Sequence, residues 1–165
     1  MPCNNKHSTT GREGMLKSRC TTCIKEYSDW GAWADSDDRK LMLLTSGKPW
    51  AIEQFNGWAQ WANTHNRKSA ILRSHCNAVI GRIVNWGEWA HTDDRKKQLL
   101  KSRCIAAIKQ VNSWGEWVNT DERRELVLKS CCRWAVAQVG GWREWARTDE
   151  RKATLITSRD PFAIQ

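Results

Sequence analysis

The chain has 165 residues, of which 40% are hydrophobic and 27% charged, and its net charge is +9. This composition is typical of a folded globular protein and excludes an intrinsically disordered chain. No segment approaches the ~20 consecutive apolar residues that a membrane-spanning helix needs. A basic balance of this size favours an acidic partner, which could be nucleic acid, an anionic membrane or an acidic protein surface.

Tryptophan pairs recur along the chain at a fixed period of 28 residues. The first members are Trp30, Trp58, Trp86, Trp114 and Trp142, and each is followed three residues later by a second tryptophan. Such a period is typical of a tandem repeat array. We divide the chain into a degenerate N-terminal capping repeat, residues 1–29, and five Trp-x-x-Trp repeats in one continuous domain. These repeats span residues 30–57, 58–85, 86–113, 114–141 and 142–165.

Each copy is expected to begin with the tryptophan-bearing helical turn and to continue with two short helices. A serine or threonine precedes an acidic or polar pair at Ser36, Thr64, Thr92, Thr120 and Thr148, as expected of the N-cap of the first helix. Glycine at Gly31, Gly87 and Gly115 lowers the helical tendency of the tryptophan turn. Whether that turn forms a separate helix is left open.

A second helix is predicted later in each copy. Cys104, Ala107, Ile108 and Val111 have the spacing of one helix face. The serine just ahead of this segment is expected to cap it, and it recurs at Ser18, Ser46, Ser74, Ser102, Ser130 and Ser158. Both helices are expected to span roughly nine residues, a length that is marginal without tertiary packing.

These elements predict an all-α fold of tandem 28-residue helical repeats stacked as a short α-solenoid. The architecture resembles the tetratricopeptide-type and pentatricopeptide-type α-solenoids, although its period is shorter. Four of the seven cysteines share one repeat position, which favours packing over a disulfide framework: Cys20, Cys76, Cys104 and Cys132. Most paired tryptophans are expected in the core, whereas Trp50 and Trp134 lie outside the pairs and are candidates for exposed contacts.

Lysine and arginine also recur at equivalent repeat positions, which we call columns. The outer column contains Arg12, Lys40, Lys68, Lys96, Arg124 and Lys152, and the inner column contains Arg39, Arg67, Arg95, Arg123 and Arg151. Two more columns flank the repeated serine, with Lys17, Arg73, Lys101 and Lys129 before it and Arg19, Arg103 and Arg159 after it. Stacked copies would align these columns into stripes of positive charge, which is the electrostatic footprint of a nucleic-acid-binding protein.

An alternative role for the cations is structural. Acidic pairs such as Asp93-Asp94 stand just before the inner arginines and could neutralise the arginines of a neighbouring copy. The chain would then be a protein-interaction scaffold. Its contacts would come from variable positions that we expect to point outward: Leu41-Met42, Ser69-Ala70, Lys97-Gln98, Glu125-Leu126 and Ala153-Thr154. The two hypotheses differ in whether the aspartates neutralise the inner arginines.

No arrangement of residues indicates catalysis. The four histidines are scattered, Cys20-x-x-Cys23 stands without a second pair at zinc spacing, and no glycine-rich phosphate loop is present. We therefore expect a non-enzymatic binding protein without a cofactor, a metal, a small-molecule substrate or a membrane partner. The segment Met1 to His7 lacks the apolar core of a secretory signal, so a reducing, cytoplasmic location is expected.

Overall fold

The computed structural model describes residues 11–164, and every regular element within them is a helix. The first ten residues of the predicted capping repeat lie outside the described residues. The described chain divides into two compact units, one ending at Ile83 and one beginning at Val84.

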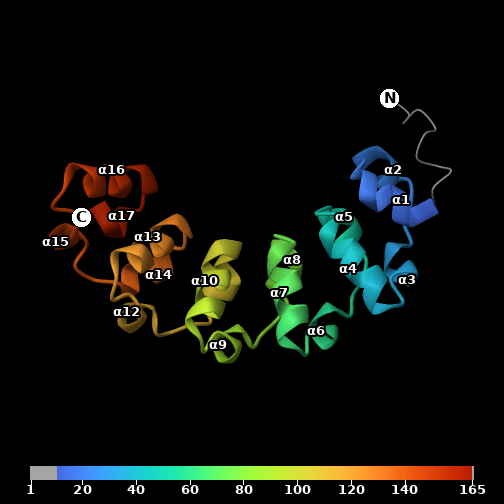
Figure 1. Ribbon diagram of the computed structural model, residues 1–165, viewed down its shortest axis with the longest axis horizontal. Coiled ribbons are helices and arrows are strands. Elements are labelled where there is room, and N and C mark those ends of the chain that lie inside the picture. The colour runs from blue at the N-terminus through green and yellow to red at the C-terminus, as the bar shows by residue number, and fades with distance from the viewer. Residues whose placement is uncertain (1–10, 165) are drawn as a thin grey trace. The chain divides into compact units, whose positions relative to one another are not determined.

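Three kinds of helix alternate along the chain (Figure 1). The long helices have 8 to 10 residues and are α1 (Gly11–Ser18), α4 (Asp37–Thr45), α7 (His65–Arg73), α10 (Asp93–Ser102), α13 (Asp121–Lys129) and α16 (Asp149–Ser158). The short helices are α2 (Thr21–Lys25), α5 (Pro49–Ile52), α8 (Asn77–Ile80), α11 (Ile105–Ile108), α14 (Arg133–Gln138) and α17 (Pro161–Ile164). The tryptophan helices are α3 (Trp30–Trp33), α6 (Trp58–Trp61), α9 (Trp86–Trp89), α12 (Trp114–Trp117) and α15 (Trp142–Trp145).

The long helices begin where the sequence predicts. Each hydroxyl of the predicted N-cap column accepts a hydrogen bond from the backbone N–H three residues later, as Thr120 does from Arg123 at 3.3 Å. Asp or Glu in the first turn of α4, α10, α13 and α16 complements the helix dipole. The tryptophan turn, left open by the sequence, is a separate four-residue helix in each of the five copies.

The predicted second helix is too long. It has 4 to 6 residues rather than nine, because hydrogen bonds between residues three apart tighten and end it. In α11 the amides of Gln110 and Val111 donate to Ala107 and Ile108 at 3.1 and 3.2 Å. The chain then turns, and Val111 still reaches the core at 4% exposure.

The serine column was predicted to cap the start of the short helix, and this prediction is wrong. The serines instead lie at the C-terminal end of the long helix. Ser102 Oγ donates to the carbonyl of Leu99 at 2.6 Å and accepts from the amide of Cys104 at 3.2 Å. The same pair of bonds recurs at Ser18, Ser46, Ser74, Ser130 and Ser158. A serine side chain can satisfy carbonyls left open at a helix end as well as amides, and local spacing does not distinguish the two roles.

Packing between neighbouring copies builds the core of each unit. In the first unit α4 lies against α1 and α7, and in the second α13 lies against α10 and α16 (Figure 1). Core residues such as Leu43, Ile71, Leu99 and Val127 have 0% exposure. The cysteines Cys76, Cys104 and Cys132 are buried in the same cores, as the packing interpretation predicts, and burial raises the pKa of the Cys76 thiol.

The first tryptophan of each pair is a core residue, as predicted. Trp30, Trp58, Trp86 and Trp114 are at most 1% exposed and Trp142 is 5% exposed. In Trp114 the indole Nε1 donates to the carbonyl of Ile108 at 3.1 Å, and its ring meets Trp117 edge to face. The second tryptophan is also buried in four copies, whereas Trp33 is half-buried.

The glycines of the tryptophan helices are required because the backbone at the end of the short helix of the same copy approaches them closely. A Cβ atom built on Gly115 would lie 2.6 Å from the backbone oxygen of Gln138, and Gly31 and Gly87 have the same clash with Gln54 and Gln110. Real Cβ atoms do not approach a backbone oxygen this closely, so glycine stands here despite its cost of about 1 kcal/mol in a helix.

Candidate nucleic-acid interface

The inner arginine column is packed against the second tryptophans. In each copy Nη1 of the arginine donates to the carbonyl of the second tryptophan, as Arg123 does to Trp117 at 2.9 Å. The guanidinium carbon of Arg123 lies 4.9 Å from the centre of the Trp117 ring, a cation–π distance that is similar in the other copies.

An aspartate of the preceding copy neutralises three of these arginines. Asp93 accepts from Nη2 of Arg123 at 2.7 Å and from Nε1 of Trp117 at 2.9 Å. Asp37 joins Arg67 to Trp61 in the same way, and Asp121 joins Arg151 to Trp145. The tryptophan hydrogen bond, together with the arginine, lowers the pKa of Asp37 and Asp93. These arginines and aspartates therefore fix the register between copies.

The outer column is also engaged with its own unit. Arg12 pairs with Asp29 at 2.6 Å and lies over the ring of Tyr27. Lys40 lies over the ring of Phe55, and Arg124 lies over Trp142 while donating to the carbonyl of Gly140. Lys68 is only 6% exposed, Lys96 is half-buried, and Lys152 is exposed and 3.8 Å from Asp149. Most cations of the outer column therefore pack against their own unit, and Lys152 is the exposed exception.

The cations around the repeated serine have a different environment. We call the turn between a long helix and its short helix the junction, and its exposed Lys and Arg side chains are the junction cations: Lys17, Arg19, Arg73, Lys101, Arg103, Lys129 and Arg159. Within residues 11–164 the only ion pair among them joins Lys129 to Glu125 at 3.6 Å. Residues 17–25, 73–81, 101–109 and 129–137 contain no Asp or Glu at all.

The backbone at the junction adopts a left-handed conformation in every copy. Arg19, His75, Arg103, Cys131 and Arg159 have φ between 53° and 57°, and Gly47 has φ 62° at the equivalent position. Glycine adopts this conformation without penalty, whereas other residues pay roughly 1–2 kcal/mol. Side chains are kept here at an energetic cost, in a column of which half is arginine, and such positions are common at functional sites.

Exposed aromatic rings accompany these cations. Trp50, Trp134 and Phe162 are 42%, 46% and 55% exposed, as expected for Trp50 and Trp134, and each follows the left-handed residue of its copy by three positions. With the Gln138 amide turned to satisfy its neighbours, Trp134 Nε1 donates to its oxygen at 2.6 Å. This bond holds the indole in place with nearly half of its surface open to solvent.

Most of the variable positions do not point outward, contrary to the prediction. Ser69 and Ala70 are buried at 3% and 7% exposure, and the side chains of Lys97 and Leu126 are half-buried. Lys97 illustrates the reason, because it reaches across to Glu122 on the next long helix, α13, at 3.2 Å. These positions lie on the sides where long helices pack, and Leu41, at 41% exposure, is the main apolar exception.

Two residues near the junction were missed by the sequence analysis. His75 occupies the same column as Arg19 and Arg103, and a search of that column for any titratable side chain would have found it. Arg133 is exposed beside Trp134, but its column has no recurring residue type and so carries no periodic signal.

Other kinds of site find no support among the described residues. Residues 11–164 contain no group of three or more His, Cys, Asp or Glu side chains that could hold a metal ion. None of the helices in this part of the chain combines the length and apolar character needed to cross a membrane. No protein-family model, curated protein or solved structure matches the chain.

Proposed function

We propose that this protein is a non-catalytic nucleic-acid-binding protein whose junction cations contact phosphates. The observation that carries the proposal is the combination of exposure, positive charge and scarcity of nearby carboxylates at the junctions. Cations without a carboxylate partner are available to neutralise phosphates, and this releases the counterions condensed on the nucleic acid, which drives association. The inner and outer columns then act mainly as structural cations, so the proposed contact set is narrower than the full set of basic columns.

The exposed rings favour single-stranded nucleic acid over an acidic protein. A base stacked on an aromatic side chain contributes roughly 1–3 kcal/mol, and any base can stack because each has a π-face. Trp134 and Phe162 lie on short helices of the second unit that pack against each other, α14 and α17. An acidic protein surface would be attracted by the same charges but would leave these rings without a specific role.

The proposal includes an array architecture. Long helices pack on their neighbours within each unit, and three arginine–aspartate pairs join consecutive copies. We propose that the 28-residue copies continue in this manner as one α-solenoid domain, in which residues 1–29 cap the N-terminal end. Equivalent junctions would then form a single line along which a strand could bind.

The alternative is a protein-interaction scaffold. It is favoured by neutralisation of the inner arginines Arg67, Arg123 and Arg151, as that hypothesis requires. It is weakened by burial of the variable positions Ser69 and Ala70, which removes part of the surface that would encode specificity.

Fluorescence anisotropy with labelled single-stranded and double-stranded DNA and RNA, at about 50 and 200 mM salt, tests the proposal. Lys101→Glu combined with Arg103→Glu should weaken single-strand binding at least ~10-fold. The negative slope of log K against log salt should become less steep by about 1.4, or ~0.7 for each lost phosphate contact. The matched control is Arg143→Glu combined with Arg147→Glu, an equal charge change at exposed residues on and just after α15. Equal loss in both double variants, or no binding by the wild type at low salt, would refute the proposal and leave the scaffold.

A further inference from the structure

One copy departs from the cationic pattern of the junctions. Thr45 and Gly47 occupy the two junction positions of α4, where the preceding copy has Lys17 and Arg19 and the following copy has Arg73 and His75. No other copy has a small residue at both positions. Space that long cationic side chains fill elsewhere is therefore open at this one point in the first unit, and a Cβ atom built on Gly47 would meet nothing within 4 Å.

A pocket of about 510 Å³ lies at this gap, between α4 and α7. Arg19, Arg73 and His75 supply its cationic and hydrogen-bonding side, and Leu41, Leu44 and Ala70 supply an apolar side. No carboxylate lines it. Its volume is within the range of sites for small organic molecules, which combine apolar walls with a few polar groups.

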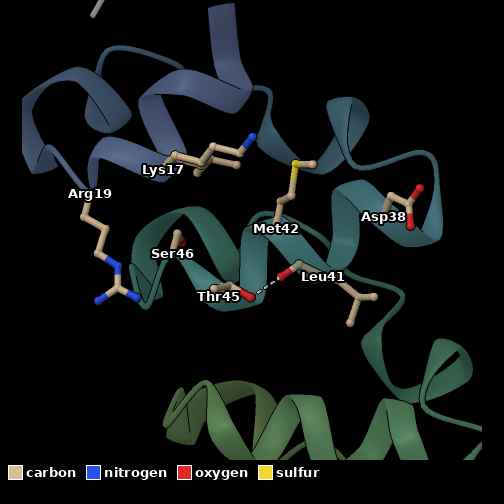
Figure 2. Close-up of a pocket in the computed structure, with 8 residues that line it drawn as sticks. Lys17, Arg19, Asp38, Leu41, Met42, Thr45 and Ser46 are labelled. Atoms are coloured by element: carbon tan, nitrogen blue, oxygen red, sulfur yellow. Dashed lines mark hydrogen bonds between the residues drawn. The ribbon is translucent and has the colours of Figure 1, made fainter.

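A second cleft of about 440 Å³, between α1 and α4, adjoins this pocket and shares Arg19, Leu41, Thr45 and Ser46 with it. Figure 2 shows this cleft, with Arg19 extending past the C-terminal end of α4 and Leu41 pointing away from Lys17. The cleft differs in containing a carboxylate, that of Asp38, at the end remote from Arg19. The anion-binding character therefore belongs to the α4–α7 pocket, and Arg19 reaches it from the preceding copy.

We infer that the α4–α7 pocket binds a nucleotide that carries a phosphomonoester, as found at the phosphorylated end of a nucleic-acid strand or in a free nucleoside monophosphate. Arg19 and Arg73 would hold the phosphate, His75 would donate a hydrogen bond to it, and the base or sugar would pack on Leu41, Leu44 and Ala70. A phosphomonoester carries about −1.5 to −2 charges near neutral pH, against −1 for a diester, so a concentrated group of cations selects it.

This inference rests on the proposed function, and it adds a feature that would fix the position of a bound strand relative to the junctions. Identical cationic junctions would let a strand shift by one copy at little cost, because every register offers the same contacts. A single pocket for a strand end would fix one register. The pocket would hold the strand end and so set the position of the diesters that follow it.

Two substitutions that each add one positive charge distinguish binding in the pocket from general electrostatic attraction by the junction cations. Gly47→Arg fills the pocket with the residue found at this position in three other copies, where Arg19, Arg103 and Arg159 have the same left-handed backbone. Cys131→Arg is the matched control, because Cys131 occupies the same column in the second unit, has φ 57° and does not line the pocket. Thr45→Lys provides a second way to fill the pocket if Gly47→Arg impairs folding.

The probes are oligonucleotides of about 10 nucleotides with a 5′-phosphate, a 3′-phosphate or hydroxyls at both ends, a length within the usual range of single-strand sites. The wild type and Cys131→Arg should prefer one phosphorylated end by ~10-fold, whereas Gly47→Arg and Thr45→Lys should lose that preference while binding the hydroxyl probe at least as tightly. Competition by free nucleoside monophosphate, with inorganic phosphate as its control, distinguishes a nucleotide held alone from one that needs its strand.

Each outcome separates this inference from the proposed function. Binding of every probe without end preference would overturn the pocket and leave the junction proposal standing. An end preference that survives Gly47→Arg and Thr45→Lys would place the end elsewhere and also overturn the inference. Absence of binding by any oligonucleotide would refute the junction proposal, and the inference would fail with it unless the free monophosphate still bound in a manner that Gly47→Arg abolishes.

Discussion

Replacement of Trp114 by alanine tests whether the paired tryptophans hold the repeats together. Trp114 is 0% exposed, and a tryptophan side chain buries up to about 250 Å². At ~25 cal/mol per Å² the transfer term is about 6 kcal/mol, which is an upper bound because the unfolded chain already buries some apolar surface. We expect Trp114→Ala to lower the free energy of unfolding by ~3–5 kcal/mol.

Two further variants divide this loss into parts. Trp114→Phe keeps an aromatic ring but removes the Nε1 donor to Ile108, so a loss of about 1–3 kcal/mol is expected for the missing hydrogen bond. The lower end applies because the amide of Val111 also donates to that carbonyl, at 3.2 Å. Trp134→Ala is the matched control, since Trp134 lies in the same unit at 46% exposure and its loss should cost about half as much as that of Trp114 or less.

The assay is urea denaturation followed by far-ultraviolet circular dichroism, which reports helix content independently of tryptophan fluorescence. Comparison of the urea midpoints and slopes gives the free-energy differences between variants. A loss below ~1 kcal/mol in Trp114→Ala would contradict the assignment of this tryptophan to the core. An equal loss in Trp134→Ala would contradict the structural distinction between paired and unpaired tryptophans.

Further predictions concern one contact within a copy and one between copies. Gly115→Ala should destabilise the fold by about 1–3 kcal/mol through its clash with Gln138, partly offset by up to ~1 kcal/mol of helix propensity. Gly140→Ala, with nothing within 4 Å of the added Cβ, should change urea stability little, and equal effects of the two substitutions would contradict the close approach at Gly115. Because folding lowers the pKa of Asp93, its contribution is fully present above pH ~4, its unfolded value, and is lost as pH falls through the folded pKa. The urea-stability difference between wild type and Asp93→Asn should therefore shrink between about pH 6 and pH 3, and a constant difference would show that the Asp93 charge has no such role.

The amino-acid sequence by itself determined the features that depend on local chemistry. Thr92 and its equivalents begin the long helices, because a side-chain hydroxyl satisfies an amide only three residues away. The 28-residue recurrence of Trp114 and its equivalents correctly placed them in the core. Exposure of Trp50 and Trp134 was predictable because their column does not conserve its residue type between copies.

Only the tertiary structure decided which cations remain open to a partner. Arginines of the inner and flanking columns are alike in the sequence, yet Arg123 meets Asp93 thirty residues earlier in the chain, whereas Arg103 meets no carboxylate. The need for glycine at Gly115 depends on how the short helix of the same copy folds back onto the tryptophan helix, whereas such pairings depend on how one copy lies on the next. The pocket beside Gly47 arises in the same way, because it is formed by side chains of three consecutive copies. The repeat period and the residue types specify the helices of each copy. Contacts between copies determine which side chains are buried or paired and which stay exposed to solvent.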